Sequence, residues 1–515
     1  MYIHCTSAVH PVSSRLVPKD RRRARALAAL AAVNPFSDHW TALEREALGE
    51  SFARRERPWS LGADADARRQ NLAALEALTA ELREKSARAL AAGDLAAEDL
   101  PVYRELALFD LYNRAIPALD ELVISGGTRR VLAYRELKVA FEAAFAVHPE
   151  LRPPFSAAHW FAGCFQLRRA FFHIFRAIVG TSQVSGHLRA QVWEAIFTAD
   201  AARYRRSLVD RMKDVPTLVL GETGTGKELV ARAIGLSGFV PFVEERLTFA
   251  GDPGAAFFPL HLAAQSPNLV ESALFGHKKG SFTGALEDRA GVFAECPAWG
   301  TVFLDEVGEL DPPLQTKLLR VLEGRDFVAL GENQPRRFVG RVVAATNRDL
   351  RAAAESGSFR RDVFFRLAGV VVQTPPLRER IADDPAELGV LVAHLSTQIA
   401  GEAEGPSLAA SVLQALAGLP VAHPWPGNVR ELSQQVRAVL VHGGLGAHDP
   451  APRRAGDWLN EASAGRLSAD ELVTHYVRHV HARVGTFEGT ARQLGLDRRT
   501  VKARVEGTLG EPQRT

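Results

Sequence analysis

The sequence predicts a multidomain fold: a helical N-terminal region, a central α/β domain and an all-α C-terminal end. The first observation is length, because 515 residues exceed what a single hydrophobic core usually holds. The second is an alternation of strand-like apolar runs with helical patterns in the middle of the chain, typical of a three-layer parallel α/β domain. The third is helical periodicity on both sides of that segment.

Composition is that of an ordinary soluble globular chain, with 46% hydrophobic residues, 24% charged residues and a net charge of +3. A contact with nucleic acid therefore has to come from a local basic patch. No apolar run reaches the roughly 18 residues of a membrane span. The N-terminus also lacks a signal-type segment, so we expect a cytoplasmic protein. Cys5, Cys164 and Cys296 lack metal-ligand spacing, which favours buried free thiols.

Residues 1–175 form the predicted N-terminal region, to which we assign a regulatory or sensory role. Ala, Leu, Arg and Glu recur with helical spacing over 71–92 and 132–148. Histidines lie among aromatic residues in 159–178, as in a haem or metal sensor. A helical core stripe explains the same run more simply, and we favour that interpretation.

Three apolar runs are predicted as parallel strands of the central domain: 217–220, 301–306 and 341–347. Helical patterns resume after about residue 380, and Gly, Pro and Ala without periodicity then indicate a linker. The predicted boundaries are 176–375 for the α/β subdomain, 376–445 for a helical lid, 446–467 for the linker and 468–510 for a helix-turn-helix unit.

A glycine-rich loop, GETGTGKE, follows the first strand and precedes a helical pattern. Its glycines let backbone N–H groups turn toward phosphate oxygens, while the helix N-terminus and Lys227 add positive charge. Strand, loop and helix in this order predict a nucleoside triphosphate site. The loop residues are Gly221, Glu222, Thr223, Gly224, Thr225, Gly226, Lys227 and Glu228.

Two carboxylates, Asp305 and Glu306, end the second predicted strand at the edge where ligands bind in such sheets. Asp305 is the candidate Mg²⁺ ligand, because Glu228 stands where Ser or Thr usually helps to hold the metal. Glu306 is the candidate base that orients the attacking water. Thr346 and Asn347 end the third strand and can sense the γ-phosphate or the water.

Three arginines are candidates for neutralising phosphate charge. Arg360 and Arg366 can act in trans from a neighbouring subunit, although surface ion pairing is the simpler alternative. Arg430 lies on the first turn of a predicted helix that Asn428 is expected to cap, so it can reach phosphate from a helical lid.

An unusual loop places one aromatic residue between glycines, in the sequence GSFTGA. An apolar tip flanked by glycines suits a hinged probe that is buried in a partner. The alternative is that Phe282 packs into its own domain and the glycines only form turns. The loop residues are Gly280, Ser281, Phe282, Thr283, Gly284 and Ala285.

The C-terminal pattern predicts one helix at about 469–484 followed by two short ones, with Gly495 at the turn between them. This is helix-turn-helix spacing. A plain helical hairpin with a basic face is the alternative. The candidate DNA-binding residues are Arg498, Arg499, Thr500, Lys502 and Arg504.

Together these motifs resemble the AAA+ ATPase domain of the bacterial enhancer-binding proteins, the activators of sigma-54 RNA polymerase. The resemblance rests on segments in the family's order: GETGTGKE, ESALFGHKKGSFTGA, GTVFLDEVGEL, LLRVLE, AATNRDL, FRRDVFFRL, PPLRER and WPGNVREL. The tail resembles the Fis-type domain of the same family. No strand pattern of a receiver domain occurs in residues 1–175.

The resemblance implies roles for single residues. By it, Asp305 and Glu306 are the Walker B pair, Thr346 and Asn347 lie in sensor I, Arg360 and Arg366 are trans-acting fingers, Arg430 is sensor II, and Ile178, Val179 and Gly180 line the adenine pocket. Glu228 is normal in this family. Two features depart from it: Ser281 replaces an Ala of the GAFTGA loop, and His261, in a lengthened segment 236–276, replaces an Asn that couples Glu306 to nucleotide state.

The resemblance also implies partners and cofactors. They are ATP and Mg²⁺, sigma-54 RNA polymerase contacted by Phe282 and Thr283, upstream double-stranded DNA, and further copies of the chain as a dimer and a hexameric or heptameric ring. Two alternatives stay open: a AAA+ remodeller of another protein, and a DNA-binding regulator with an inactive, nucleotide-sensing ATPase domain.

Overall fold

The computed structural model describes residues 16–57, 64–127, 129–263, 266–420, 423–445 and 467–506, together with 458, 462 and 465. The chain divides into two compact units, Met1–Leu445 and Gly446–Thr515, which are taken one at a time below. Cys5 and most of the predicted linker lie outside the described residues. The predicted domain boundaries stay predictions.

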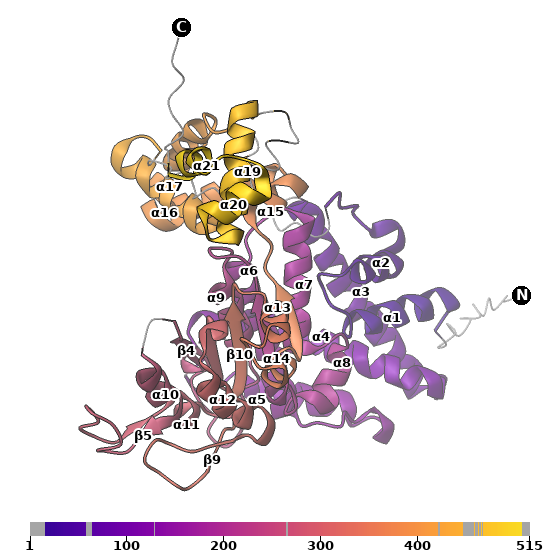
Figure 1. The fold of residues 1–515 in the computed structure, drawn as a ribbon. Coiled ribbons are helices and arrows are strands. Elements are labelled where there is room, and N and C mark those ends of the chain that lie inside the picture. Colours follow the sequence, from indigo (N-terminus) through magenta and orange to yellow (C-terminus); the bar gives the residue numbers. More distant parts are fainter. Residues whose placement is uncertain are drawn as a thin grey trace, which may run out of the picture. The chain divides into compact units, whose positions relative to one another are not determined.

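The N-terminal part of the first unit is helical, as the sequence predicts. Its helices are α1 (Pro18–Leu30), α2 (Asp38–Leu48), α3 (Ala65–Ala91), α4 (Leu100–Ile124), α5 (Tyr134–Phe145) and α6 (Ala157–Ala177). Side-chain oxygens cap the N-termini of α2 and α6: Ser37 accepts from the Trp40 N–H, and Ser156 accepts from the His159 N–H. In Figure 1 these helices are drawn in indigo to purple.

A five-stranded parallel sheet forms the centre of the same unit. Its order is β11 (Val370–Gln373), β1 (Thr217–Leu220), β10 (Arg341–Thr346), β7 (Thr301–Asp305) and β4 (Phe257–His261). The three predicted strands are confirmed as β1, β7 and β10, and β4 and β11 complete the sheet at its edges. Short hairpins add β2 (Phe242–Val243) with β3 (Thr248–Phe249), β5 (Gly276–His277) with β6 (Arg289–Ala290), and β8 (Asp326–Phe327) with β9 (Arg336–Arg337).

Helices cover this sheet and bury its apolar strands. They are α7 (Gln183–Phe197), α8 (Ala201–Arg203), α9 (Lys227–Gly235), α10 (Pro267–Phe275), α11 (Val292–Glu295), α12 (Pro312–Gly324), α13 (Leu350–Glu355) and α14 (Arg361–Leu367). Every residue of β10 is buried, which explains its continuous apolar run. Polar side chains are left at the carboxyl ends of the strands.

Three helices follow the sheet: α15 (Leu377–Asp383), α16 (Ala386–Leu416) and α17 (Asn428–His442). Gly401 breaks α16 with a φ of 80°, so it behaves as two helices joined by a kink. Leu391, Val412, Leu432 and Val436 are buried in the core of this part. This is the helical region predicted after the α/β subdomain.

The lengthened segment at 236–276 joins the N-terminal helices to the central domain. Its hairpin β2–β3 buries Phe242 and Phe249 in the same core as α4, α5 and α6. The Val131 N–H donates to the Leu247 carbonyl at 2.8 Å. The N-terminal helices therefore share a continuous core with the ATPase-like part.

Within the residues described continuously in the second unit, 467–506, the helices are α19 (Ala469–Val484), α20 (Phe487–Leu494) and α21 (Arg498–Glu506). Ser468 and Glu471 form a reciprocal capping box at the start of α19. Gly495 turns the chain between α20 and α21 with a φ of 66°, in the place predicted for the turn. Val477, Ala491 and Val501 form the small core. Within the described parts of both units, the helices all fall short of the length and apolar character that crossing a membrane requires.

Candidate nucleotide site

The glycine-rich loop runs between β1 and α9, in the predicted order. Gly221, Gly224 and Gly226 have φ values of 154°, 81° and 95°, which residues other than Gly rarely adopt. A Cβ atom on Gly224 would lie 2.2 Å from the Gly427 carbonyl oxygen, so the close approach of α17 also requires Gly. The loop is thus shaped to turn its N–H groups toward an anion.

Lys227 is the first residue of α9, directly after this loop, and is largely buried. Its ammonium donates to the carbonyls of Gly221 at 3.0 Å and Glu222 at 3.2 Å. Burial lowers the pKa of Lys227, with Glu306 and Asp305 acting against that shift. A bound triphosphate would stabilise this cation further.

Glu306 is held at the sheet edge by the two polar residues that end β10. Its Oε2 accepts from the Thr346 hydroxyl at 3.4 Å and from the Asn347 N–H at 3.2 Å. Asn347 Nδ2 donates to Thr223 Oγ1 of the glycine loop at 2.9 Å. Glu306 itself has a φ of 54°, a strained conformation of the kind found at functional sites. The predicted base, sensor residues and loop are therefore together.

His261 contacts Asp305. The two residues are register partners on β4 and β7, and His261 Nδ1 lies 3.0 Å from Asp305 Oδ2. The side chain of His261 is 51% exposed and that of Asp305 is 25% exposed. The imidazole thus reaches the predicted magnesium ligand in this chain.

The donor set fits Mg²⁺ bound together with nucleotide. Mg²⁺ usually takes one or two carboxylates and completes its shell with phosphate and water. Asp305 lies at the sheet edge near Lys227 and supplies such a carboxylate. Among the described residues no cluster of three or more His, Cys, Asp or Glu side chains is placed to hold a metal.

The α15–α17 region contacts the glycine loop. One of the contacting side chains has a role that the sequence analysis did not predict. Asn428 was expected to cap its helix, which is wrong: Gly427 is the N-cap residue and makes no side-chain cap. Asn428 has a φ of 52°, accepts from the Leu377 N–H at 2.8 Å and donates to the Thr223 carbonyl at 3.0 Å. It bridges loop and lid instead.

Arg430 follows on the exposed face of α17. Its Cβ lies 3.1 Å from the point where a Gly224 Cβ would be, and its charge acts on the pKa of Lys227. The Val429 N–H donates to the Gly224 carbonyl at 3.1 Å. The structure therefore brings the predicted lid arginine to the phosphate loop.

Ile178, Val179 and Gly180 join α6 to α7 beside the lid. Arg189 of α7 donates to the Ile178 carbonyl at 3.1 Å and to the Gly180 carbonyl at 2.5 Å. Arg380 of α15 donates to the Val179 carbonyl. The predicted adenine-binding segment is held by guanidinium groups from both sides.

Arg360 and Arg366 do not join this cluster within the same chain. Arg360 pairs with Asp362 at 2.7 Å, and Arg366 pairs with Glu323 at 2.9 Å. Both arginine side chains are about half exposed, at 44% and 57%. A role in trans stays a prediction that this exposed position allows.

The GSFTGA loop forms a tight turn. The Gly280 N–H donates to the Ala285 carbonyl at 2.8 Å, and the Ala285 N–H donates to the Phe282 carbonyl at 3.0 Å. The Phe282 ring packs edge-on against His277, with ring centres 5.0 Å apart. Phe282 is half-buried on its own domain and Thr283 is exposed.

The predicted DNA-binding residues lie on α21 but differ in their surroundings. Arg498, Arg499, Thr500 and Lys502 are exposed. Arg504 instead donates to Thr474 Oγ1 of α19 at 2.6 Å and pairs with Asp470. Its guanidinium holds two helices of the unit together.

Sequence reasoning missed three residues that shape the nucleotide site. Arg378 pairs with Glu222 of the loop at 2.6 Å, and Thr374 Oγ1 lies 2.7 Å from Thr225 Oγ1. Glu387 accepts from the Ser182 N–H at 2.9 Å, next to the adenine-binding segment. The PPLRER motif contains Arg378 and was the one signal available; the other two contacts depend on the fold.

Comparison with known proteins identifies the central domain. The family model of the sigma-54 interaction domain matches residues 198–373. The hydrogenase transcriptional regulatory protein HoxA of Cupriavidus necator is 44% identical over 233 residues, which cover 45% of this chain and 44% of HoxA. The Nif-specific regulatory protein of Azotobacter vinelandii is 39% identical, covering 56% of this chain and 53% of that protein.

A further relative is the anaerobic nitric oxide reductase transcription regulator NorR of Aeromonas salmonicida. It is 35% identical over 326 residues, covering 62% of this chain and 60% of NorR. The chain spans about half the length of the curated relatives it matches. The resemblance inferred from the motifs is confirmed for the central domain: the chain carries a sigma-54 interaction domain, and the relatives that match it are named as transcriptional regulators.

Proposed function

We propose that this protein is an ATP-hydrolysing transcriptional activator that remodels the closed complex of sigma-54 RNA polymerase. It assembles in the cytoplasm as a dimer and then a hexameric or heptameric ring, and its C-terminal unit binds upstream double-stranded DNA. One observation supports this above all: Glu306, Thr346 and Asn347 converge on a phosphate loop inside a sigma-54 interaction domain.

The chemistry follows from the positions of these groups. Lys227 and the loop N–H groups bind the β- and γ-phosphates, and Glu306 orients the water that attacks the γ-phosphate. Asp305 would hold Mg²⁺, which when bound neutralises charge on the phosphate oxygens. Arg430 contacts phosphate from the same chain, whereas Arg360 and Arg366 reach it from a neighbouring subunit.

Phe282 is the proposed contact with sigma-54. The ring lies half-buried against His277, so contact requires it to leave that position as the nucleotide state changes. Gly280 and Gly284 have φ values of 82° and 103° and supply the freedom for this movement.

The test is capture of sigma-54 by the full chain in the presence of a transition-state analogue of ATP. Phe282→Ala is expected to abolish capture and to leave ATP hydrolysis within about twofold. Leu286→Ala is the matched control, because it removes another apolar side chain directly after the loop, and that side chain is 78% exposed. Undiminished capture by Phe282→Ala would favour remodelling of another protein through a pore loop.

A second candidate function is a DNA-binding regulator whose ATPase domain only senses nucleotide. The hydrogen bond of His261 to Asp305 favours it, because the imidazole competes for the carboxylate that Mg²⁺ needs. Tight ATP binding without turnover in the wild-type protein, and turnover restored in His261→Asn, would support this candidate.

A further inference from the structure

A mostly apolar pocket of about 150 Å³ lies where the N-terminal helices meet the central domain. Its walls come from α1, α4 and α6 on one side and from α7 and the π-helical turn Tyr204–Leu208 on the other. Both sides belong to the same compact unit. The nucleotide-site residues named above do not line it.

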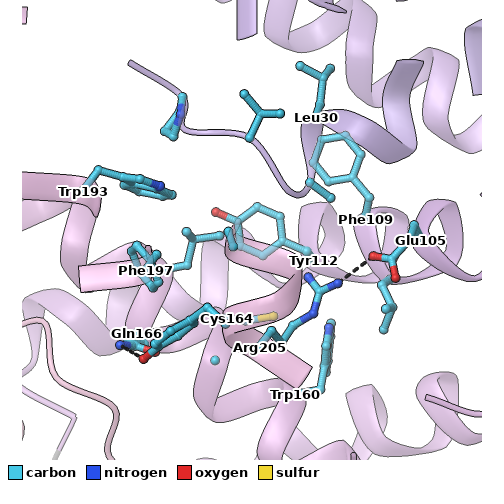
Figure 2. A pocket seen from close by; sticks show the side chains of 18 of the residues that line it. Leu30, Glu105, Phe109, Tyr112, Trp160, Cys164, Gln166, Trp193, Phe197 and Arg205 are labelled. Carbon is cyan, nitrogen blue, oxygen red and sulfur yellow. Dashed lines mark hydrogen bonds and ion pairs between the residues drawn. The ribbon is translucent and has the colours of Figure 1, made fainter. Parts of the chain in front are cut away.

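Aromatic rings make a large part of the wall. Figure 2 shows Phe109, Tyr112, Trp160, Trp193 and Phe197 arranged around the cavity. Trp160, Trp193 and Phe197 are nearly fully buried. Cavities of this size with apolar walls stay dry and accept one benzene-sized molecule.

Charge in the wall is cancelled within the protein. Glu105 and Arg205 form an ion pair at 2.6 Å, drawn as a dashed line in Figure 2. Burial raises the pKa of Cys164 and of Tyr204 to about 12, so both stay neutral near pH 7. A charged ligand would find no counter-ion left to pair with it.

Two N–H groups in the wall are buried without an acceptor. In the part of the chain that the structure describes, neither Trp193 Nε1 nor Arg205 Nε has a hydrogen-bond partner. Buried donors are almost always satisfied, and leaving one unpaired is costly. A ligand oxygen in the cavity would satisfy the donor that it reaches.

We propose that this cavity binds a small uncharged molecule with one aromatic ring and a hydrogen-bond acceptor, and that the ligand regulates nucleotide binding. The regulatory half of this proposal rests on the proposed ATP site. The binding half does not.

The route to the nucleotide site is short. The helix α6, which carries Trp160 and Cys164, ends directly before Ile178 of the adenine-binding segment. The next helix, α7, carries Trp193 and also Arg189, which holds the carbonyls of Ile178 and Gly180. A ligand that shifts either helix therefore moves the segment predicted to contact adenine.

Binding is tested on the full chain with three ligands, by calorimetry and ligand-observed NMR. Acetophenone has the ring and an acceptor, ethylbenzene is similar in size and lacks the acceptor, and benzoate adds a negative charge. We expect acetophenone to bind several times more tightly than ethylbenzene and at least tenfold more tightly than benzoate. Failure of both neutral ligands to bind overturns the proposal.

Gly163→Leu locates the site. Gly163 lines the cavity on α6, and among the described residues no heavy atom approaches within 4 Å of its ideal Cβ position. The Cβ atom of Leu meets no neighbour there, the rest of the side chain takes up cavity volume, and Leu favours the helix. Gly389→Leu on α16 is the matched control, since Gly389 has the same free space and lies outside the cavity wall. Acetophenone affinity should fall at least tenfold in Gly163→Leu alone, and equal affinity in both variants overturns the location.

Trp193→Phe tests the hydrogen bond. Phe keeps an aromatic ring, smaller than the indole, and lacks the indole N–H, so acetophenone should bind no better than ethylbenzene in this variant. A retained preference for acetophenone assigns the acceptor contact to another group and overturns this part of the proposal.

Regulation is tested by titrating ATP with and without saturating acetophenone, and acetophenone with and without ATP. The two affinity ratios must agree by linkage, and we expect a change of about fivefold or more. Ligand binding with an unchanged ATP affinity overturns the regulatory half. If the protein binds acetophenone but not ATP, the proposed function is wrong, and the proposal that the cavity binds a ligand still holds.

Discussion

The phosphate loop and the cavity at the N-terminal junction lie in one compact unit, but they present different kinds of chemical groups. The loop offers backbone N–H groups, Lys227 and carboxylates at strand ends. The cavity offers aromatic rings from helices, with its one ion pair satisfied internally. The first site selects by charge and geometry, and the second selects by size and shape. Changes of charge should therefore damage the first, and changes of volume the second.

The largest effect is expected from the loop. Lys227→Ala removes the buried cation that we propose binds the β- and γ-phosphates, so ATP turnover should fall by about 10³-fold or more. Folding should change little, because the loop glycines set the backbone. A coupled ATPase assay with thermal unfolding of the same sample checks both. Turnover within tenfold of wild type would contradict the charge-based description of this site.

The cavity wall should respond through stability. Trp193→Ala deletes a buried ring that packs on Phe36 and Phe197, and should lower the free energy of unfolding by about 3–5 kcal/mol. Urea titration measures it, and Leu286→Ala on the surface serves as the control, with an expected change within about 0.5 kcal/mol. A loss below 1 kcal/mol for Trp193→Ala would mean that the wall is loosely packed.

Acidification should act through α6, the helix that carries one wall of the cavity. Burial, together with Arg169, Arg232 and Arg176, lowers the pKa of His173 to about 4. The unfolded chain binds this proton near its ordinary pKa of about 6.5, so stability is lost as pH falls from about 6.5 toward 4. His173→Gln should remove about 1–2 kcal/mol of this dependence in unfolding curves measured at several pH values. An unchanged slope in the variant would show that His173 titrates normally.

The smallest effects are expected in the C-terminal unit, where one arginine is exposed and another is bonded to a neighbouring helix. Arg499 is exposed, so Arg499→Ala should weaken DNA binding by about tenfold, reduce the salt slope by about one and leave stability unchanged. Arg504→Ala should instead destabilise the unit by about 1 kcal/mol, because it loses bonds to Asp470 and Thr474. Fluorescence anisotropy and thermal unfolding separate the two outcomes. Equal loss of stability in both variants would contradict the distinction.

The nucleotide site was largely predictable because its parts are local. A glycine loop after a strand, and carboxylates at a strand end, indicate a phosphate site from the local sequence alone, without knowledge of the rest of the fold. Asn428 is a residue for which local prediction fails. The pattern around it is typical of a helix cap, but its side chain instead accepts a hydrogen bond from the distant Leu377 N–H. His261 likewise contacts Asp305 because β4 pairs with β7 in a register that spacing alone does not reveal.

The cavity could not be predicted in this way. The run 159–178 indicates a core stripe, and α6 does bury Trp160, Phe161 and Phe165 in the core. A space between helices depends on how segments as distant as Leu30 and Phe197 pack, and each of their patterns is that of an ordinary amphipathic helix. Apolar periodicity predicts that a face is buried, without predicting how completely it is filled.

The central claim is that the cluster of residues around Lys227 and Glu306 hydrolyses ATP. The most direct test measures ATP binding and ATP turnover side by side in the full-length protein and in Glu306→Gln. Both proteins are predicted to bind ATP with similar affinity, and only the wild type is predicted to turn it over. Equal turnover in the two proteins, or a wild type that binds ATP and never hydrolyses it at any protein concentration, would contradict the claim.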